Sequence, residues 1–160
     1  MAIIYRAIEE KDNKPIADLI RTVFREFKID KPGTVYTDPT TDNLFELFKT
    51  FRSAYWICEE DGQILGGCGV YPTNGLPDGC AELVKLYLAK ESRGKGIGKA
   101  LIQKSIKSAR DFGFRQLYLE SFPELGKAVA IYEKIGFKRL GNPLGNSGHH
   151  ACTLWAIMDL

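Results

Sequence analysis

The sequence predicts an α/β (α+β) fold of about seven strands and about four helices, with residues 1–160 as a single domain. Three observations indicate this. The length of 160 residues is typical of one domain. Apolar residues follow strand and helix periods in the order β-α-α-β-β-β-α-β-α-β-β. No internal repeat, low-complexity tract or linker divides the chain.

The first third of the chain predicts one strand and two helices separated by a loop. Residues 3–8 are strand-like, and Asp12 or Asn13 can cap the helix that follows. The apolar stripe of that helix is Ile16, Leu19, Ile20, Val23, Phe24 and Phe27. A loop rich in Pro, Thr and Asp at 30–42 precedes the second helix, for which Asp42 is the expected cap. The apolar stripe of the second helix is Leu44, Phe45, Phe48 and Phe51.

The middle of the chain predicts three consecutive strands. Residues 55–58 and 64–71 flank an Asp-Gly pair, which is typical of a tight hairpin. After a turn at 72–78, residues 80–88 alternate well enough to form the next strand.

The last third predicts two helices and three strands. A glycine-rich turn at 93–98 opens a helix whose inward residues are Ile97, Leu101, Ile102, Ile106, Ala109 and Phe112. Residues 114–119 form the fifth strand, and a helix of about ten residues then ends at Gly136. The apolar stripe of that helix is Ala128, Ile131, Tyr132 and Ile135. Two final strands are expected at 137–140 and 151–159.

Charge and cysteine content exclude several classes of protein. Lys and Arg number 22 and Asp and Glu 20, so a net charge of +2 predicts neither nucleic acid nor a membrane as main partner. The start of the chain lacks a secretory pattern, and no apolar run is long enough to span a bilayer. The cysteines at 58, 68, 80 and 152 form no C-x-x-C pair. We interpret them as buried, reduced thiols of a cytoplasmic protein and expect no metal.

The turn from Ser92 to Lys99 has the composition of a phosphate-binding site. Its glycines let a ligand approach the backbone, and the helix that follows adds a partial positive charge. Arg93, Lys95 and Lys99 add cations. The spacing matches neither the G-x-G-x-x-G dinucleotide motif nor a Walker loop. The alternative is a tight turn that only starts a helix.

Two segments resemble motifs of the GNAT N-acetyltransferase family. Arg93 to Gly98 matches Q/R-x-x-G-x-G/A between a strand and a helix, and Ala128 to Phe137 is similar to A-x-x-L-Y-x-K-x-G-F. The order of elements is also that of the family, so the resemblance covers essentially the whole chain. It implies a mixed central sheet of about seven strands flanked by about four helices.

The resemblance implies acetyl-CoA as cosubstrate, without a metal. Its diphosphate would contact the glycine-rich turn, mainly through backbone N–H groups. The residues assigned to that contact are Arg93, Gly94, Lys95, Gly96, Ile97, Gly98 and Lys99. The pantetheine arm would pair with the strand residues Leu86, Tyr87 and Leu88, and the Leu86 amide would donate to the thioester carbonyl.

The resemblance also implies two catalytic residues. Tyr132 occupies the position of the acid that protonates the leaving thiolate, although its helical stripe is equally that of a core tyrosine. Glu82 matches the general base of one branch of the family. Because Glu82 alternates with Val84 and Leu86, it can instead be a structural carboxylate on one face of the sheet. Leu125 stands where many members have a cofactor-binding Asn, so that contact is open.

The acceptor side is expected in the loops at 31–41 and 142–150. His149 and His150 can bind an acceptor or act as base, and the alternative is an exposed surface loop. Glu120, at the end of a strand, is a candidate for binding an ammonium group.

Together these features predict an N-acetyltransferase that moves an acetyl group from acetyl-CoA to a primary amine by direct attack in a ternary complex. The compact chain favours a small-molecule acceptor over a protein, and a monomer or homodimer. Two alternatives stay open: a non-catalytic GNAT-like module that senses acyl-CoA, and an unrelated enzyme that binds nucleotide phosphates.

Overall fold

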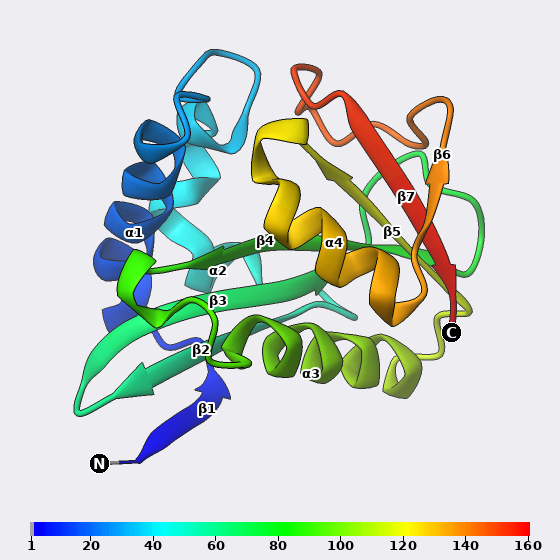
Figure 1. The fold of residues 1–160 in the computed structure, drawn as a ribbon. Coiled ribbons are helices and arrows are strands. Elements are labelled where there is room, and N and C mark those ends of the chain that lie inside the picture. The colour runs from blue at the N-terminus through cyan, green and yellow to red at the C-terminus, as the bar shows by residue number, and fades with distance from the viewer. Residues whose placement is uncertain (1) are drawn as a thin grey trace.

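The computed structural model describes residues 2–160 and contains one seven-stranded mixed sheet flanked by helices (Figure 1). The strands are β1 (Ile3–Ala7), β2 (Ala54–Glu60), β3 (Gln63–Tyr71), β4 (Cys80–Leu88), β5 (Gln116–Ser121), β6 (Lys138–Leu140) and β7 (Leu154–Asp159). The α-helices are α1 (Asn13–Glu26), α2 (Leu44–Leu47), α3 (Ile97–Asp111) and α4 (Gly126–Ile135). The predicted fold class and element order are confirmed.

The sheet order is β1-β2-β3-β4-β5-β7-β6, and every neighbouring pair is antiparallel except β4 and β5. Helices cover both faces (Figure 1). One buried cluster joins the sheet to α3 and α4, and a second joins it to α1 and α2. The four cysteines are buried thiols, as expected. In the described part of the chain, no helix is both long and apolar enough to cross a bilayer.

The hairpin between β2 and β3 forms as the Asp-Gly pair predicts. Asp61 and Gly62 both have positive φ, +51° and +80°, which matches the twist that a two-residue hairpin turn needs. The turn joins β2 to β3, whose pairing runs from Glu60 with Gln63 to Ala54 with Val70.

β4 and β5 are paired along only part of their length. Their parallel pairing runs from Cys80 with Gln116 to Glu82 with Tyr118. Beyond that point, residues 83–88 of β4 have no described partner on β5, so one edge of their backbone is unpaired. The opening between the two strands is where the candidate site lies.

A bulge at Lys85 changes which side chains of β4 share a face. Lys85 has a φ of +56°, and the pairing with β3 shifts register around it. Val84 packs against the α1 cluster, whereas Leu86 packs against the α3 cluster. The expectation that Glu82, Val84 and Leu86 alternate on one face is therefore wrong beyond Val84, because the inserted residue reverses the alternation.

The second predicted helix is much shorter than its apolar stripe. α2 ends at Leu47, whose carbonyl accepts a hydrogen bond from Thr50 Oγ1 at 2.7 Å. The turns that follow leave Phe51 85% exposed, so this residue does not belong to an inward stripe. Asp42 does not cap the helix either, because its carboxylate pairs with Arg21.

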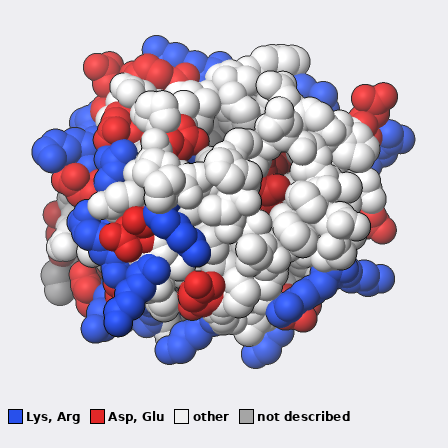
Figure 2. Space-filling view, turned by 90° about the horizontal axis from the view of Figure 1, so that it is seen from above, with Lys and Arg blue, Asp and Glu red and all other residues white. Residues whose placement is uncertain are grey.

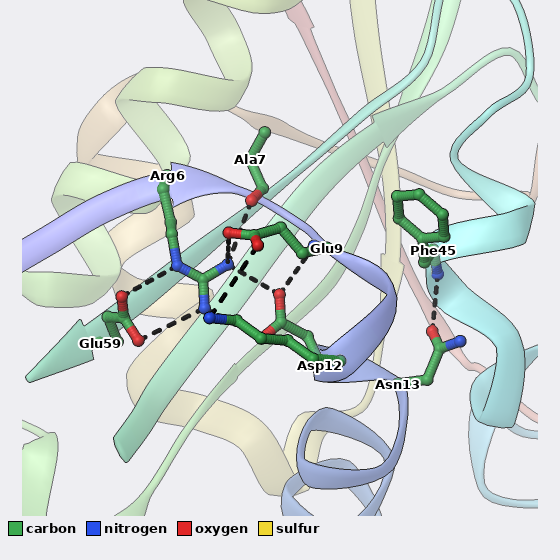
Figure 3. A network of polar contacts seen from close by, with 8 residues as sticks. Arg6, Ala7, Glu9, Asp12, Asn13, Phe45 and Glu59 are labelled. Atoms are coloured by element: carbon green, nitrogen blue, oxygen red, sulfur yellow. Dashed lines mark hydrogen bonds and ion pairs between the residues drawn. The ribbon is translucent and has the colours of Figure 1, made fainter. Parts of the chain in front are cut away.

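The start of α1 is held by an ion-pair network and not by a side-chain cap (Figure 3). The Arg6 guanidinium donates to both carboxylate oxygens of Asp12, at 2.8 and 2.9 Å, and to Glu59 on β2. The Glu9 amide also donates to Asp12. Burial alone would raise the pKa of Asp12, but the hydrogen bonds from Arg6 and the Glu9 amide outweigh it and lower that pKa.

Arg6→Met is expected to lower the free energy of unfolding by about 3 kcal/mol, because it leaves the Asp12 carboxylate buried without its cation. Urea unfolding at pH 7 measures the loss. Lys14→Met, which removes an exposed ion pair with Asp18, is the control and should change stability by less than about 1 kcal/mol. Because the pKa of Asp12 is lowered in the folded state, the difference between Arg6→Met and wild type should shrink as the pH falls below about 4. A loss that does not depend on pH would contradict this account of Arg6.

Candidate active site

A small cavity opens where β4 and β5 separate. It encloses about 40 Å³ and is lined by Val35, Glu82, Leu83, Val84, Lys85, Leu86, Tyr87, Glu120, Ser121, Phe122, Leu125, Tyr132, His149 and Cys152. Figure 2 looks onto the end of the molecule that carries the 31–41 and 142–150 loops, and shows acidic atoms recessed in a hollow among uncharged residues. The cavity brings together both predicted catalytic residues and the acceptor candidates Glu120 and His149. Tyr87 and Leu86 also line it, whereas Leu88 and His150 do not.

Glu82 lies at the point where the pairing of β4 with β5 ends, and its carboxylate is nearly inaccessible. It is 4% exposed, and Thr73 Oγ1 donates to its Oε1 at 2.6 Å. Burial raises the pKa of Glu82 to about 7, although the hydrogen bond from Thr73 favours the ionised form. A carboxylate that titrates near neutral pH can accept a proton in one step and release it in the next.

Tyr132 reaches the cavity from α4. Its ring packs edge-on against Phe137, with 5.8 Å between ring centroids, and the residue is 8% exposed. Burial raises the pKa of Tyr132, so the phenol stays protonated at neutral pH. Its hydroxyl has no hydrogen-bond partner among the described residues, and it is therefore available as a proton donor to a ligand.

The two loops expected on the acceptor side do meet. His149 Nε2 lies 2.9 Å from Asp38 Oδ2, and the Ala151 amide donates to the Gly33 carbonyl. The hydrogen bond with His149 lowers the pKa of Asp38 well below its usual range. His150 packs on Gly33 so closely that a Cβ there would lie 2.5 Å from Nε2. The pair therefore separates into His149 at the cavity and His150 in the contact between the loops.

Glu120 is fixed by two hydroxyl groups. Ser147 Oγ donates to its Oε1 at 2.5 Å, and the Tyr118 hydroxyl donates to its Oε2 at 2.7 Å. The Leu144 amide donates to Tyr118 in turn, so the 142–150 loop is tied to β5 at two points. The carboxylate consequently has a defined place at the wall of the cavity.

The glycine-rich turn follows β4, a strand that lines the cavity, and carries a series of amides without an acceptor among the described residues. Gly94 and Gly96 have φ of +77° and +80°, and α3 begins at Ile97. No described backbone or side-chain acceptor takes the six amides of residues 94–99, and a Cβ on Gly94 or Gly96 would meet only open space. Consecutive free N–H groups at the start of a 15-residue helix form an anion-binding surface.

Arg93 does not line the rim of this turn as expected. Its guanidinium donates to Glu26 on α1 at 2.7 and 2.8 Å and to the Leu88 carbonyl at 3.0 Å, and it lies over the ring of Phe27. Its own amide donates to the Lys90 carbonyl. Arg93 therefore braces the turn against α1, and the exposed Lys95 and Lys99 supply the cations at the turn itself.

The sequence reasoning missed Lys85, Thr73 and Asp38. Lys85 is 9% exposed, lines the cavity, and is held at the bulge by a hydrogen bond from the Tyr55 hydroxyl to its carbonyl at 2.7 Å. Burial lowers the pKa of Lys85, while the charges of Asp38 and Glu82 act in the opposite direction. The only sequence signal was that Glu82 and Lys85 are charged residues three positions apart in an apolar strand. Two residues at that spacing cannot both be buried on one face of the sheet without a bulge between them.

Comparisons with known proteins agree with the observed fold. Residues 18–137 match the sequence model of the Acetyltransferase (GNAT) family. A protein of Escherichia coli (strain K12), named "Uncharacterized N-acetyltransferase YjgM", is 36% identical over 98% of this chain and 95% of its own length. A crystal structure of an acetyltransferase of GNAT family from Staphylococcus aureus Mu50 has a TM-score of 0.87 at 20% identity, covering 99% of both chains. The PaiA N-acetyltransferase of Thermoplasma acidophilum, solved in complex with coenzyme A, has a TM-score of 0.75 at 18% identity over all of both chains.

Proposed function

Because this chain belongs to the acetyltransferase (GNAT) family, we propose that it transfers the acetyl group of acetyl-CoA to a primary amine by direct attack in a ternary complex. The observation that carries the proposal is the cavity between β4 and β5. It holds a carboxylate whose pKa burial raises to about 7, on β4, and a protonated phenol, on α4. The turn that follows β4 adds six amides that have no acceptor among the described residues. Across residues 2–160, no three His, Cys, Asp or Glu side chains are close enough to hold a metal ion.

The residues present fit acetyl-CoA as substrate. The amides of residues 94–99 would hold its diphosphate, with Lys95 and Lys99 at the rim. The unpaired edge of β4 at Leu86–Leu88 would hydrogen-bond the pantetheine amides as an added strand does. The Leu86 amide would donate to the thioester carbonyl oxygen and stabilise the negative charge that develops there.

The reaction needs proton transfers at both the nitrogen and the sulfur. An amine is mostly protonated in water near pH 7, so Glu82 would accept one proton, directly or through water, before the nitrogen attacks. The new bond joins nitrogen to the acetyl carbon, and the bond from that carbon to sulfur breaks. Tyr132 would then donate its phenolic proton to the leaving thiolate. The nitrogen then loses its second proton, which restores the Tyr132 phenol through water, and Glu82 releases the proton it accepted to bulk water.

A thiol-release assay with acetyl-CoA and a library of small amines tests the proposal, alongside calorimetry with coenzyme A. We expect binding of coenzyme A and release of free thiol that depends on an added amine. If coenzyme A binds but no amine causes release of free thiol from acetyl-CoA, the alternative of a non-catalytic module that senses acyl-CoA is favoured. Absence of binding would overturn both functions. If ATP binds to the protein and acetyl-CoA does not compete with it, the alternative of a nucleotide-binding enzyme is favoured.

Gly96→Ala is expected to weaken coenzyme A binding by about tenfold or more. The new methyl group meets no protein atom, so it would occupy the space through which the diphosphate reaches the amides. Gly62→Ala is a matched control, because Gly62 has the same φ of +80° and open space around it but lies in the β2–β3 turn. Calorimetry should show wild-type affinity for Gly62→Ala. Equal losses in the two variants would mean that backbone strain, and not contact with the ligand, explains the effect.

A further inference from the structure

The cavity contains a buried lysine whose ammonium group has no partner among the residues that the structure describes. Lys85 is 9% exposed, and no ion pair or hydrogen bond with another residue in the range 2–160 involves its ammonium group. The two carboxylates whose charges it senses are otherwise engaged: Asp38 with His149 and Thr40, and Glu82 with Thr73. Buried lysines are uncommon unless they are paired, so this ammonium group is available to an anion from outside the chain.

The fold holds Lys85 in this place at a cost. Its φ of +56° is unfavourable for a residue with a side chain, and its carbonyl is fixed by the Tyr55 hydroxyl. Glycine would suit the backbone and methionine would suit the burial better than lysine does. Strain and desolvation together at a cavity wall are typical of a functional position.

The other charges of the cavity define the ligand further. Glu82 and Glu120 lie on its walls and attract an ammonium group, whereas Lys85 attracts an anion. A doubly charged phosphate beside two carboxylates would be repelled more strongly than a singly charged carboxylate. The enclosed volume of about 40 Å³ limits the part of the acceptor held here to a few atoms.

We propose that the acceptor is a small amino acid, whose carboxylate pairs with Lys85 while its amine faces Glu82 and Glu120. This inference rests on the proposed acetyltransferase function and names its substrate class. The proposal includes free amino acids as acceptors and excludes protein N-termini and polyamines, because protein N-termini and polyamines lack a carboxylate next to the reacting amine.

Matched acceptors test the inference. L-amino acids with small, thioether and aromatic side chains are each compared with their amides and their decarboxylated amines in the thiol-release assay. For wild type we expect kcat/KM to be at least about 100-fold higher for the best amino acid than for its amide. Lys85→Met keeps most of the length of the side chain and removes its charge. It should lower the ratio of kcat/KM for amino acid over amide about 100-fold, mainly through KM, and Lys85→Arg should restore part of the ratio.

Two further measurements make the outcome decisive. Lys107→Met removes an exposed lysine of α3 that pairs with Asp111 and does not line the cavity, and it should leave the ratio unchanged. The melting temperature of Lys85→Met should equal or exceed that of wild type, because a buried charge is lost. Turnover of amines but not of amino acids, or a ratio that Lys85→Met does not change, would overturn this inference and leave the acetyltransferase intact. Binding of coenzyme A without turnover of any acceptor would overturn both.

Discussion

Replacing Tyr132 by phenylalanine is expected to lower kcat about 100-fold or more while KM changes less than about threefold. The variant keeps the ring and its edge-on contact with Phe137, so the loss isolates the hydroxyl. Without a donor, the thiolate must leave unprotonated, which affects the transition state and not substrate binding. Steady-state kinetics with the best acceptor of the amine library measure both constants.

Tyr71→Phe is the matched control. Its hydroxyl hydrogen-bonds with Thr50 and no other described residue, and Tyr71 does not line the cavity, so kcat should stay within about twofold of wild type. An unchanged kcat in Tyr132→Phe would remove the acid role from Tyr132 and leave it as a core residue of α4. A rise in KM with constant kcat would assign it to substrate binding.

The architecture followed from local patterns because each element carries its own signal. The β2–β3 hairpin needed two residues with positive φ and the sequence supplies Asp61 and Gly62. α3 needed one apolar face and begins directly after the glycines. Where tertiary contacts compete with local preference, the patterns were wrong: Asp12 does not cap α1, because its carboxylate accepts from Arg6 and from the Glu9 amide.

The candidate site was predictable only where a motif fixes a position along the chain. Such a motif located the glycine-rich turn and Tyr132, but it could not show that Arg93 would pair with Glu26 instead of facing a ligand. Lys85 escaped prediction because a bulge is set by the register between two strands, not by one of them. His149 and Asp38 lie 111 positions apart, and a single sequence gives no signal that links them.

Glu82→Gln is expected to lower kcat/KM about 100-fold at pH 8 and to remove the acid limb of the pH profile, which for wild type should lie near pH 7. The amide keeps the shape of the side chain and can still accept a hydrogen bond from Thr73.

The stability of Glu82→Gln provides the control for this loss of activity. Because the pKa of Glu82 is raised in the folded state, the folded protein still holds, between about pH 4.5 and 7, a proton that the unfolded chain has released. This group therefore makes the wild type less stable as the pH rises through that window. Glu82→Gln should melt at a higher temperature than wild type at pH 8, so lost activity cannot be attributed to unfolding.

Thr73→Val distinguishes Glu82 from His149 or free water as the base. The Thr73 hydroxyl donates to the carboxylate at 2.6 Å and lowers its pKa, so its removal should raise the pKa of Glu82 further. The acid limb should then move up by about one pH unit, with a loss of up to about tenfold at pH 6.5 and nearly full activity at pH 9. Thr50→Val removes a hydroxyl that donates to the Leu47 carbonyl, far from the cavity, and should leave the profile in place. A limb that stays fixed in Thr73→Val would mean that another group accepts the proton, and His149, held by Asp38 at the same cavity, would be the next residue to replace.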